Sequence, residues 1–511
     1  MKKRALVSVS DKTGLVDFVK GLQELGWEII ATGGTQKLLD SSGVRTIGIS
    51  EVTGFPEICD GRVKTLHPKV HGGILARRDV PEHMQTLKEN GIETIELVCV
   101  NLYPFKQTIA KPDVTMEDAI ENIDIGGPSM VRSAAKNWKD VNIVCDPLDY
   151  DKVLEELRTN GWTSDETRLK LSAKAYTHTA EYDMMISTYM REKAGLNKKL
   201  FLEYDLKQGL RYGENPHQEA EFFASTEPAP FSLAFARQIQ GKELSYNNIQ
   251  DANAALNVVR DFDEPFCVAL KHMNPCGAAT AATIEEAWQA AYEADKVSIY
   301  GGIVAVNREL TAKVAEGMKP IFLEIVIAPS FTAEALEILA TKKNLRVMQV
   351  DMTKNGAAVP QFISVNGGML AQKLDTQIEK ITPDMCVTKV KPTESQLKEL
   401  DFGWKIVKHI KSNAIAVVKD NHTIGVGAGQ TNRVGSAEIA LNEAKAAGFT
   451  EGLVLASDGF LPFGDTVELA AKYGVTAIVQ PGGSIRDEES IQKADELGIT
   501  MLFTGVRHFK H

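Results

Sequence analysis

Apolar and polar residues follow each other in a pattern that predicts alternating strands and helices along the first part of the chain. Short apolar runs are typical of buried strands, and apolar residues three or four positions apart are typical of helices. The predicted strands span 4–9, 27–31, 95–100 and 141–145, and the predicted helices span 13–25, 36–41 and 165–193. Strands that alternate with helices form a parallel sheet with helices on its faces.

The second part of the chain continues the α/β pattern after a short polar stretch. That stretch, GLNKK at 195–199, predicts a linker, which we place at 196–200 between a first domain at 1–195 and a second region at 201–511. The predicted strands of the second region span 201–204, 206–218, 266–270, 303–306, 325–328, 346–351, 414–419, 452–456 and 477–480, with a helix at 284–294. A chain of this length is expected to contain roughly two to four domains.

Polar loops after predicted strands are candidate ligand sites, because parallel sheets bind ligands at the carboxyl ends of their strands. The loops at 8–12, 32–35 and 100–103 occupy such positions. Hydroxyls, a lysine and free N–H groups at a helix start suit a phosphate, although ordinary strand-to-helix turns share this composition. The residues concerned are Ser10, Asp11, Lys12, Thr32, Gly33, Gly34 and Thr35.

Cations are concentrated in the segment 61–73, GRVKTLHPKVHGG, which contains Arg62, Lys64 and Lys69. So many cations beside few apolar residues predict a loop that binds an anion. Its two histidines suggest a metal site, but no carboxylate or cysteine lies at the spacing that zinc sites use. A second basic pair, Arg132 and Lys136, lies on one face of a predicted helix, where a solvated basic face is the alternative.

A lysine and a histidine, Lys271 and His272, end the predicted buried strand 266–270. Asn274-Pro275 and Gly277 follow, and they predict that the strand breaks there. A fixed positive charge beside a base that titrates near neutral pH suits group transfer to an amine. The alternative is a surface lysine and a core histidine ahead of a turn, since such dipeptides are common.

Composition narrows the classes of function. The net charge of −11 argues against a general nucleic-acid binder, which needs a basic face, but local cation clusters can still bind small anions. Six cysteines without a CxxC spacing favour reduced thiols and a cytoplasmic protein. The N-terminus lacks the pattern of a signal peptide, and no apolar run approaches the ~20 residues of a membrane span.

Several motifs, taken together and in order, resemble the AICAR transformylase/IMP cyclohydrolase family of purine biosynthesis. They include SVSDKTG, ATGGT, GRVKTLHPKVHGG, NLYPF, IDIGGPSMVRSAAKN, RYGENPHQ, KHMNPCG, SNAI, GVGAGQTNR, ASDGFLPFGD and VRHFKH. The resemblance implies a methylglyoxal-synthase-like cyclohydrolase domain at 1–195. It also implies a transformylase region at 201–511 built of two cytidine-deaminase-like units.

The resemblance also implies the chemistry. A formyl group passes from 10-formyltetrahydrofolate to the 5-amine of AICAR, and the formylated product, FAICAR, then closes to IMP with loss of water. These are the last two steps of IMP synthesis, and no catalytic metal is expected. A homodimer is implied, with transformylase sites built from both subunits, and neither nucleic acid nor a membrane is an expected partner.

For the cyclohydrolase, the resemblance assigns catalysis to Lys64, Tyr103, Asp124 and Lys136, with Lys136 as proton donor and acceptor. The nucleotide contacts that it implies are Ser10, Asp11, Lys12, Thr32, Gly33, Gly34, Thr35, Arg62, Val63, Thr65, Val100, Asn101 and Ile125.

For the transformylase, the resemblance assigns His272 as the base, Lys271 as the cation that stabilises an oxyanion, and Asn413 as a residue that positions the substrate. Glu324 stands where we expect an aspartate in some members, so this contact departs from the pattern. The implied AICAR contacts are Arg211, Tyr212, Gly301, Glu324, Arg433, Phe460 and Arg507, and the implied folate contacts are Val434, Asp465, Ser484 and Ile485.

Three alternative functions remain at this point. A zinc deaminase needs HxE and PCxxC, whereas Met273-Asn274 follow His272 and Gly-Ala-Ala follows Cys276, so the catalytic glutamate and the second cysteine are missing. A non-catalytic nucleotide-binding module is the second alternative, because methylglyoxal-synthase-like folds also serve in regulation. In the third, only one half of the chain is active.

Overall fold

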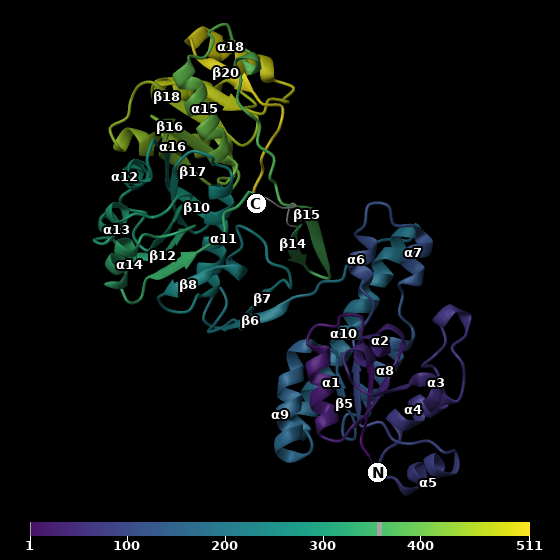
Figure 1. Ribbon diagram of the computed structural model, residues 1–511. Coiled ribbons are helices and arrows are strands. Elements are labelled where there is room, and N and C mark those ends of the chain that lie inside the picture. Colours follow the sequence, from purple (N-terminus) through teal and green to yellow (C-terminus); the bar gives the residue numbers. More distant parts are fainter. Residues whose placement is uncertain (1, 355–359) are drawn as a thin grey trace. The chain divides into compact units, whose positions relative to one another are not determined.

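The computed structural model describes residues 2–354 and 360–511 (Figure 1). The chain forms two compact units, which we call the N-terminal unit (Met1–Glu203) and the C-terminal unit (Tyr204–His511). The predicted domain limits and the linker at 196–200 stay predictions. Within the described residues, no helix has both the length and the apolar character needed to cross a membrane.

The N-terminal unit contains the predicted parallel sheet, in the order β3-β2-β1-β4-β5. Four of its strands were predicted, and the short β3 was missed. The strands are β1 (Arg4–Ser8), β2 (Glu28–Ala31), β3 (Thr46–Gly48), β4 (Leu97–Val100) and β5 (Asn142–Val144). The helices are α1 (Leu15–Glu24), α2 (Gly33–Ser41), α3 (Ile49–Thr53), α4 (Pro68–Leu75), α5 (Pro81–Glu89), α6 (Phe105–Ile109), α7 (Met116–Glu121), α8 (Gly126–Lys136), α9 (Tyr150–Asn160) and α10 (Asp165–Lys193).

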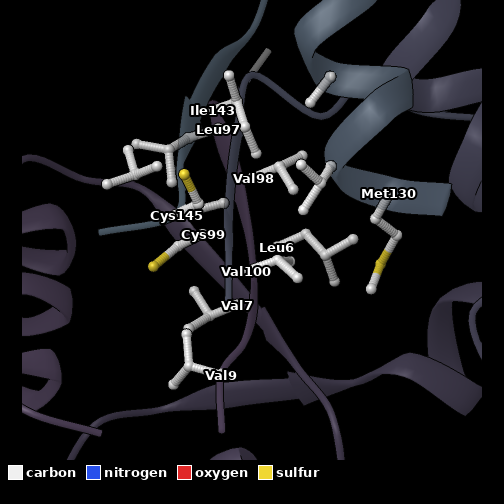
Figure 2. Packing of buried hydrophobic residues seen from close by; sticks show 14 of the residues in the cluster. Leu6, Val7, Val9, Leu97, Val98, Cys99, Val100, Met130, Ile143 and Cys145 are labelled. Carbon is white, nitrogen blue, oxygen red and sulfur yellow. The ribbon is translucent and has the colours of Figure 1, made fainter. Parts of the chain in front are cut away.

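The strands of this sheet are held together by the burial of their apolar side chains. Figure 2 shows side chains of β1 and β4, such as Leu6 and Val98, packed together in the core, and both are fully buried. Strand order reverses direction at β1, whose neighbours are β2 on one side and β4 on the other. A crevice opens at the carboxyl ends of parallel strands at such a switch point. The fold therefore places the loops after β1 and β4 at the mouth of one crevice.

The C-terminal unit is built around one mixed sheet of eleven strands, ordered β20-β19-β18-β16-β17-β10-β9-β11-β12-β13-β8. Its chain runs twice through the same series: a helix, a hairpin, and then three helix–strand pairs. The first repeat is α11 (Tyr246–Arg260), β9 (Phe266–Lys271), β10 (Asn274–Thr280), α12 (Ile284–Ala294), β11 (Gly302–Val306), α13 (Ala312–Met318), β12 (Leu323–Ala328), α14 (Ala333–Ala340) and β13 (Arg346–Gln349).

The second repeat has the same order. It consists of α15 (Glu394–Val407), β16 (Ile415–Lys419), β17 (His422–Gly427), α16 (Arg433–Ala446), β18 (Leu453–Ser457), α17 (Asp465–Lys472), β19 (Val475–Gln480), α18 (Asp487–Leu497) and β20 (Thr500–Phe503). The central strands β10 and β17 are antiparallel neighbours and join the two repeats (Figure 1). Two repeated units agree with the predicted pair, and their likeness to cytidine deaminases stays a prediction.

Three smaller elements complete the C-terminal unit. β8 (Arg237–Gln240) forms one edge of the large sheet, and two separate two-stranded ribbons are formed by β6 (Asp205–Leu210) with β7 (Ala220–Ala224) and by β14 (Pro360–Val365) with β15 (Gly368–Lys373).

Two strand predictions in this unit were wrong. The residues 201–204 form no strand, and β6 ends at Leu210 rather than at Gln218, because a turn follows in which Gln218 donates to the carbonyl of Asn215. The break expected after His272 is instead a tight hairpin, since Asn274 is the first residue of β10. Pro275 is accommodated near a register shift in this strand, a place where proline is tolerated in sheets.

The same close packing of a strand against a helix occurs in both repeats. A Cβ atom added at Gly277 of β10 would overlap the carbonyl oxygen of Ala291 in α12, and one at Gly425 of β17 would overlap that of Ala440 in α16. Glycine is therefore required twice, at matching positions, for the central hairpins to lie directly against their covering helices.

We predict that Gly277→Ala and Gly425→Ala each lower the stability of the C-terminal unit by about 1–3 kcal/mol or more, because rigid backbone must move to admit the methyl group. Thermal unfolding followed by circular dichroism measures the loss. Gly209→Ala in β6 is the matched control, since no atom lies within 4 Å of its added Cβ. Equal midpoints for all three variants and the parent would contradict this packing argument.

Candidate active sites

A cleft of about 570 Å³ lies in the N-terminal unit, at the carboxyl ends of β1, β2 and β4. This is the position that the strand order predicts. Thirteen of the predicted site residues line it: Ser10, Lys12, Thr32, Gly33, Gly34, Thr35, Arg62, Lys64, Thr65, Asn101, Tyr103, Asp124 and Ile125.

Asn101 fixes the loop after β1. Its side-chain oxygen accepts hydrogen bonds from the N–H groups of Ser10 (2.6 Å) and Asp11 (3.0 Å), and its amide donates to the carbonyl of Asp11 (2.9 Å). The carboxylate of Asp11 turns away to accept from Thr13. Asp11 therefore contributes backbone rather than charge to this part of the cleft, and it is not among the lining residues.

Two helices begin at the cleft. Thr32 precedes α2 in an extended conformation, and α8 starts at Gly126, directly after Ile125. Helix N-termini present free N–H groups and a partial positive charge, which suit an anion. The hydroxyls beside α2 are already organised, because Thr32 bonds Ser8 (2.6 Å) and Thr35 accepts from the N–H of Val9 (3.1 Å).

Lys64, Tyr103 and Asp124 form the chemical centre of this cleft. The ammonium of Lys64 lies 3.9 Å from the carboxylate of Glu57. Burial raises the pKa of Asp124, although the N–H of Gly127 (2.7 Å), the charge of Lys64 and the N–H of Tyr103 act in the opposite direction. Burial and the nearby Asp124 carboxylate raise the pKa of the Tyr103 phenol. A cation, a half-buried carboxyl group and a phenol therefore share one partly desolvated space.

Some predicted residues lie outside the lining of this cleft. Val63 pairs with Ile58 in an isolated bridge, and Val100 is buried at the end of β4. Lys136 is exposed at the last position of α8, ten residues or about 15 Å along the helix from the end that meets the cleft. Arg62 does line the cleft, and its guanidinium pairs with Glu121.

The two histidines of the cationic segment have other partners. His67 caps α4 by accepting from the N–H of Lys69 (3.1 Å), and His71 bonds the hydroxyl of Ser133 (3.0 Å). Burial lowers the pKa of His71, which favours the neutral imidazole. Across residues 2–354 and 360–511, no group of three or more His, Cys, Asp or Glu side chains is arranged to hold a metal ion.

In the C-terminal unit, Lys271 and His272 lie at the tip of the β9–β10 hairpin. Lys271 ends β9 and pairs with Asn274, so His272 and Met273 form a two-residue turn. Their φ angles are 53° and 64°, in the left-handed region that both positions of a type I′ turn require. The hairpin therefore carries both side chains beyond the end of the sheet.

Neighbouring strand ends surround Lys271. Its ammonium donates to the carbonyl of Tyr300 (2.9 Å), which precedes Gly301 and β11. Glu324 lies near the start of β12, beside β11, and its carboxylate forms an ion pair with Arg346 (2.7 Å). Gly301 has a φ of 73°, a conformation that glycine adopts without strain. Lys271, Gly301 and Glu324 thus lie at the same end of three neighbouring strands, β9, β11 and β12.

The antiparallel pairing of β10 with β17 brings loops of the second repeat to the same end of the sheet. The N–H of Lys411 donates to the side chain of Asn274 (2.9 Å), two residues after His272. Asn413 follows closely, but its amide contacts the carbonyl of Gln430 (2.9 Å) and the guanidinium of Arg433 (2.7 Å) rather than His272. Both contacts of the Asn413 side chain are thus made within the second repeat.

Arg433 is held by a buried carboxylate. Asp458 pairs with its guanidinium and also accepts from the N–H of Ala414 (3.1 Å), while the hydroxyl of Ser457 lies 3.1 Å from the same guanidinium. This arrangement fixes Arg433 and, through it, the side chain of Asn413. Sequence reasoning missed Asp458. Its place after a buried strand within the ASDG motif marks a polar residue at a strand end, but it does not reveal Arg433 as the partner.

The remaining transformylase positions are mostly exposed. Arg211 stacks on the ring of Tyr212 just after β6, and Arg507 stacks on that of Phe509. Phe460 is partly exposed and Ile485 is fully exposed. Val434, Asp465 and Ser484 lie at the starts of α16 and α17 and in the loop before α18. Within the described residues, none of these side chains forms a hydrogen bond, ion pair or ring contact with Lys271 or His272.

The environment of Cys276 does not suit a zinc ligand. This residue lies on β10, where its thiol donates weakly to the carbonyl of Ala269 (3.4 Å), and burial raises its pKa to about 12. A zinc ligand must be a thiolate, which this environment disfavours.

Comparison with known proteins identifies the family to which the chain belongs. The model of the AICARFT/IMPCHase bienzyme family matches residues 134–443, and the model of the MGS-like domain matches residues 14–129. The bifunctional purine biosynthesis protein PurH of Bacillus cytotoxicus is 60% identical over the whole of both chains, and those of Bacillus mycoides and Bacillus anthracis are 59% identical over the same extent.

A chain from the solved "Crystal structure of ForH" shares 38% identity over 37% of this chain and 98% of its own, but the TM-score of 0.34 carries no structural argument. The family model covers more than half of the chain, and the full-length relatives are far above 30% identity. The chain therefore belongs to the AICARFT/IMPCHase bienzyme family and is a bifunctional AICAR formyltransferase and IMP cyclohydrolase of the last two steps of IMP biosynthesis.

Proposed function

We propose that the two units divide the two reactions, with ring closure in the N-terminal cleft and formyl transfer at the β9–β10 turn. The observation that carries the first assignment is the cluster of Lys64, Tyr103 and Asp124 between two helix N-termini. The observation that carries the second is the hairpin turn that presents Lys271 and His272 together. We further infer that the formyl donor is 10-formyltetrahydrofolate, acting as co-substrate, and that no catalytic metal takes part.

Ring closure needs charge stabilisation and proton transfer. The carboxamide nitrogen of FAICAR attacks the formyl carbon, a C–N bond forms, and the formyl oxygen becomes an oxyanion. Lys64 stabilises that oxyanion. Asp124 and Tyr103 transfer two protons from the nitrogens of the closing ring to the oxygen, one as the C–N bond forms and one as the C–O bond breaks, so that the oxygen leaves as water. The helix N-termini of α2 and α8 and the hydroxyls beside them bind the phosphate. The role carried over for Lys136 rests on the resemblance alone.

Formyl transfer needs a base, because the ring withdraws electrons from the 5-amine of AICAR. His272 takes the proton that the amine loses as its nitrogen attacks the formyl carbon. Lys271 stabilises the tetrahedral oxyanion, and the C–N bond to the folate then breaks as that nitrogen takes up a proton. Arg433 and Asn413, fixed by Asp458, contribute to binding the ribotide, as do Arg211, Tyr212 and Arg507.

Two further features belong to the proposal. A cytoplasmic location agrees with six free cysteines and no disulfide partner among them in the described chain. A homodimer agrees with the two ribbons, whose apolar side chains are 44–58% exposed, as contiguous apolar surface often marks association. The residues concerned are Leu206 and Phe223 of the first ribbon and Ile363, Val365, Met369 and Leu370 of the second.

We expect His272→Ala and Lys271→Ala to lower kcat for formyl transfer by about 10²–10⁴-fold, the usual contribution of a general base or a charge-stabilising group. Ring closure of supplied FAICAR should be unchanged. Lys419→Ala is the matched control, because Lys419 occupies the corresponding place in the hairpin of the second repeat. Near-parental formyl transfer by His272→Ala would exclude its role as the base.

Lys64→Ala should have the reverse effect. Loss of the cation that faces the oxyanion is expected to slow closure of FAICAR by about 10²–10³-fold, while release of tetrahydrofolate from the transfer reaction stays at the parental rate. Lys69→Ala, a change in the same cationic segment outside the cleft lining, should leave both rates unchanged. If Lys69→Ala slowed ring closure as much as Lys64→Ala does, the rate would depend on the total positive charge of the segment and not on the position of Lys64 in the cleft.

Dialysis against a strong chelator is expected to leave both activities unchanged, because the proposed steps use only side chains and backbone groups. Elemental analysis of the purified protein accompanies the assay. Stoichiometric zinc that is lost together with formyl transfer, and restored with it, would refute the metal-free proposal. A non-catalytic N-terminal module, the other alternative, would bind FAICAR without releasing IMP.

A further inference from the structure

The turn that presents His272 contains a residue that does not favour it, Met273. Positive φ at both central positions of a two-residue hairpin is the property of Asn, Asp and Gly. The matching turn of the second repeat follows this preference, with Asp420 and Asn421 at φ angles of 49° and 56°. In the first repeat the two positions are occupied by His272 and Met273, and this conformation is costly for Met273. Other contacts must therefore hold the turn.

Three polar side chains supply those contacts, and two of them come from distant parts of the chain. The carboxylate of Asp251, on α11, accepts the N–H of Met273 (2.8 Å). The ammonium of Lys510, near the C-terminus, lies 3.4 Å from the carbonyl of Met273 and donates to that of His409 (2.8 Å). The side chain of Asn274 donates to the carbonyl of His272 (3.0 Å). Both backbone polar groups of Met273 are thus held by charged side chains.

The second repeat contains a natural comparison for Asp251. Glu399, on the matching helix α15, accepts the N–H of Asp420 (2.7 Å), so a carboxylate holds the hairpin turn in both repeats. Burial raises the pKa of Asp251 and of Glu399 alike. The two carboxylates differ in their charged neighbours: the charge of His272 acts on Asp251, whereas the charges of Lys419 and Asp420 act on Glu399 in opposite directions.

We propose that Asp251 is a positioning residue for formyl transfer, which holds the strained turn in place and stabilises the imidazolium that forms when His272 accepts the proton of the amine. This inference rests on the proposed role of His272 as the base. The other charged side chains with contacts at the turn are Lys271 on β9 and Lys510 near the C-terminus, and both are cationic. Asp251 is the anionic group that opposes them at the imidazole.

Two substitutions separate the contributions of Asp251. Asp251→Ala removes the hydrogen bond and the charge, and kcat for formyl transfer should fall about 10- to 100-fold, since misplacement of a catalytic group costs that much. Asp251→Asn keeps an acceptor oxygen for Met273 and removes only the charge. For that variant we expect a smaller loss of kcat and a shift of the acidic limb of the pH–kcat profile towards lower pH, with KM for AICAR little changed.

Controls distinguish positioning from general stability. Glu399→Ala and Glu399→Gln remove the matching contacts in the second repeat and should leave the pH–kcat profile unchanged, whatever they do to the unfolding midpoint. In a His272→Ala background, Asp251→Asn should have no further effect on formyl transfer, because its partner is gone. All variants are tested as the full chain, with AICAR and 10-formyltetrahydrofolate as substrates.

Failure of this proposal and failure of the proposed function give different results. If His272→Ala abolishes transfer while both Asp251 variants keep the parental kcat and pH profile, Asp251 has no positioning role. A loss in Asp251→Ala that merely parallels a lowered unfolding midpoint, with an unshifted profile in Asp251→Asn, overturns the proposal as well. If His272→Ala itself retains transfer, the assignment of the base is wrong and the inference about Asp251 falls with it.

Discussion

The pairing of β10 with β17 is the contact on which the C-terminal unit depends. Ala279 lies opposite His422 in this antiparallel pair, and the N–H of Ala278 reaches the hydroxyl of Thr423 (2.9 Å). Because the strands run in opposite directions, the start of β10 lies beside the end of β17. A turn from one repeat and the loops around Asn413 and Arg433 from the other are thereby brought together. Neither repeat contains this set of residues alone.

In the N-terminal unit, a different arrangement of strands also brings residues from separate loops together. Its crevice follows from the reversal of strand order at β1, and its charges come from loops that reach over the carboxyl edge. Partial burial changes the acidity of two of these groups, because it raises the pKa of Asp124 and of Tyr103 near the ammonium of Lys64. The two proposed sites thus have similar chemical content, a cation with candidate proton-transfer groups, on different arrangements of strands.

Much of this organisation could be predicted from the sequence where patterning was strong. The helices α10 and α12 begin and end where the periodicity indicated, and the strand end at Lys271 was placed correctly. The hairpin after it could not be, because Asn274-Pro275 and Gly277 have the composition of a turn, whereas the structure tolerates the proline near a register shift and requires the glycine against α12. Strands rich in small or polar residues, such as β17, were missed for a similar reason.

For the sites, sequence motifs identified residues but not their partners. The cleft lining of the N-terminal unit was largely predicted, yet the distance of Lys136 along α8 depends on the direction of that helix. Asp458 and Asp251 went unnoticed because their roles arise from contacts with residues far away in the chain, Arg433 and Met273. Such contacts are set by the tertiary fold and leave no local pattern.

The most direct measurement of the central claim is a single progress curve. The purified protein is incubated with AICAR and 10-formyltetrahydrofolate, and tetrahydrofolate and IMP are followed together. Two working sites in one chain predict that both products are released and reach equal amounts. Release of neither product would contradict the account, and accumulation of FAICAR without IMP would show that the N-terminal cleft does not close the ring.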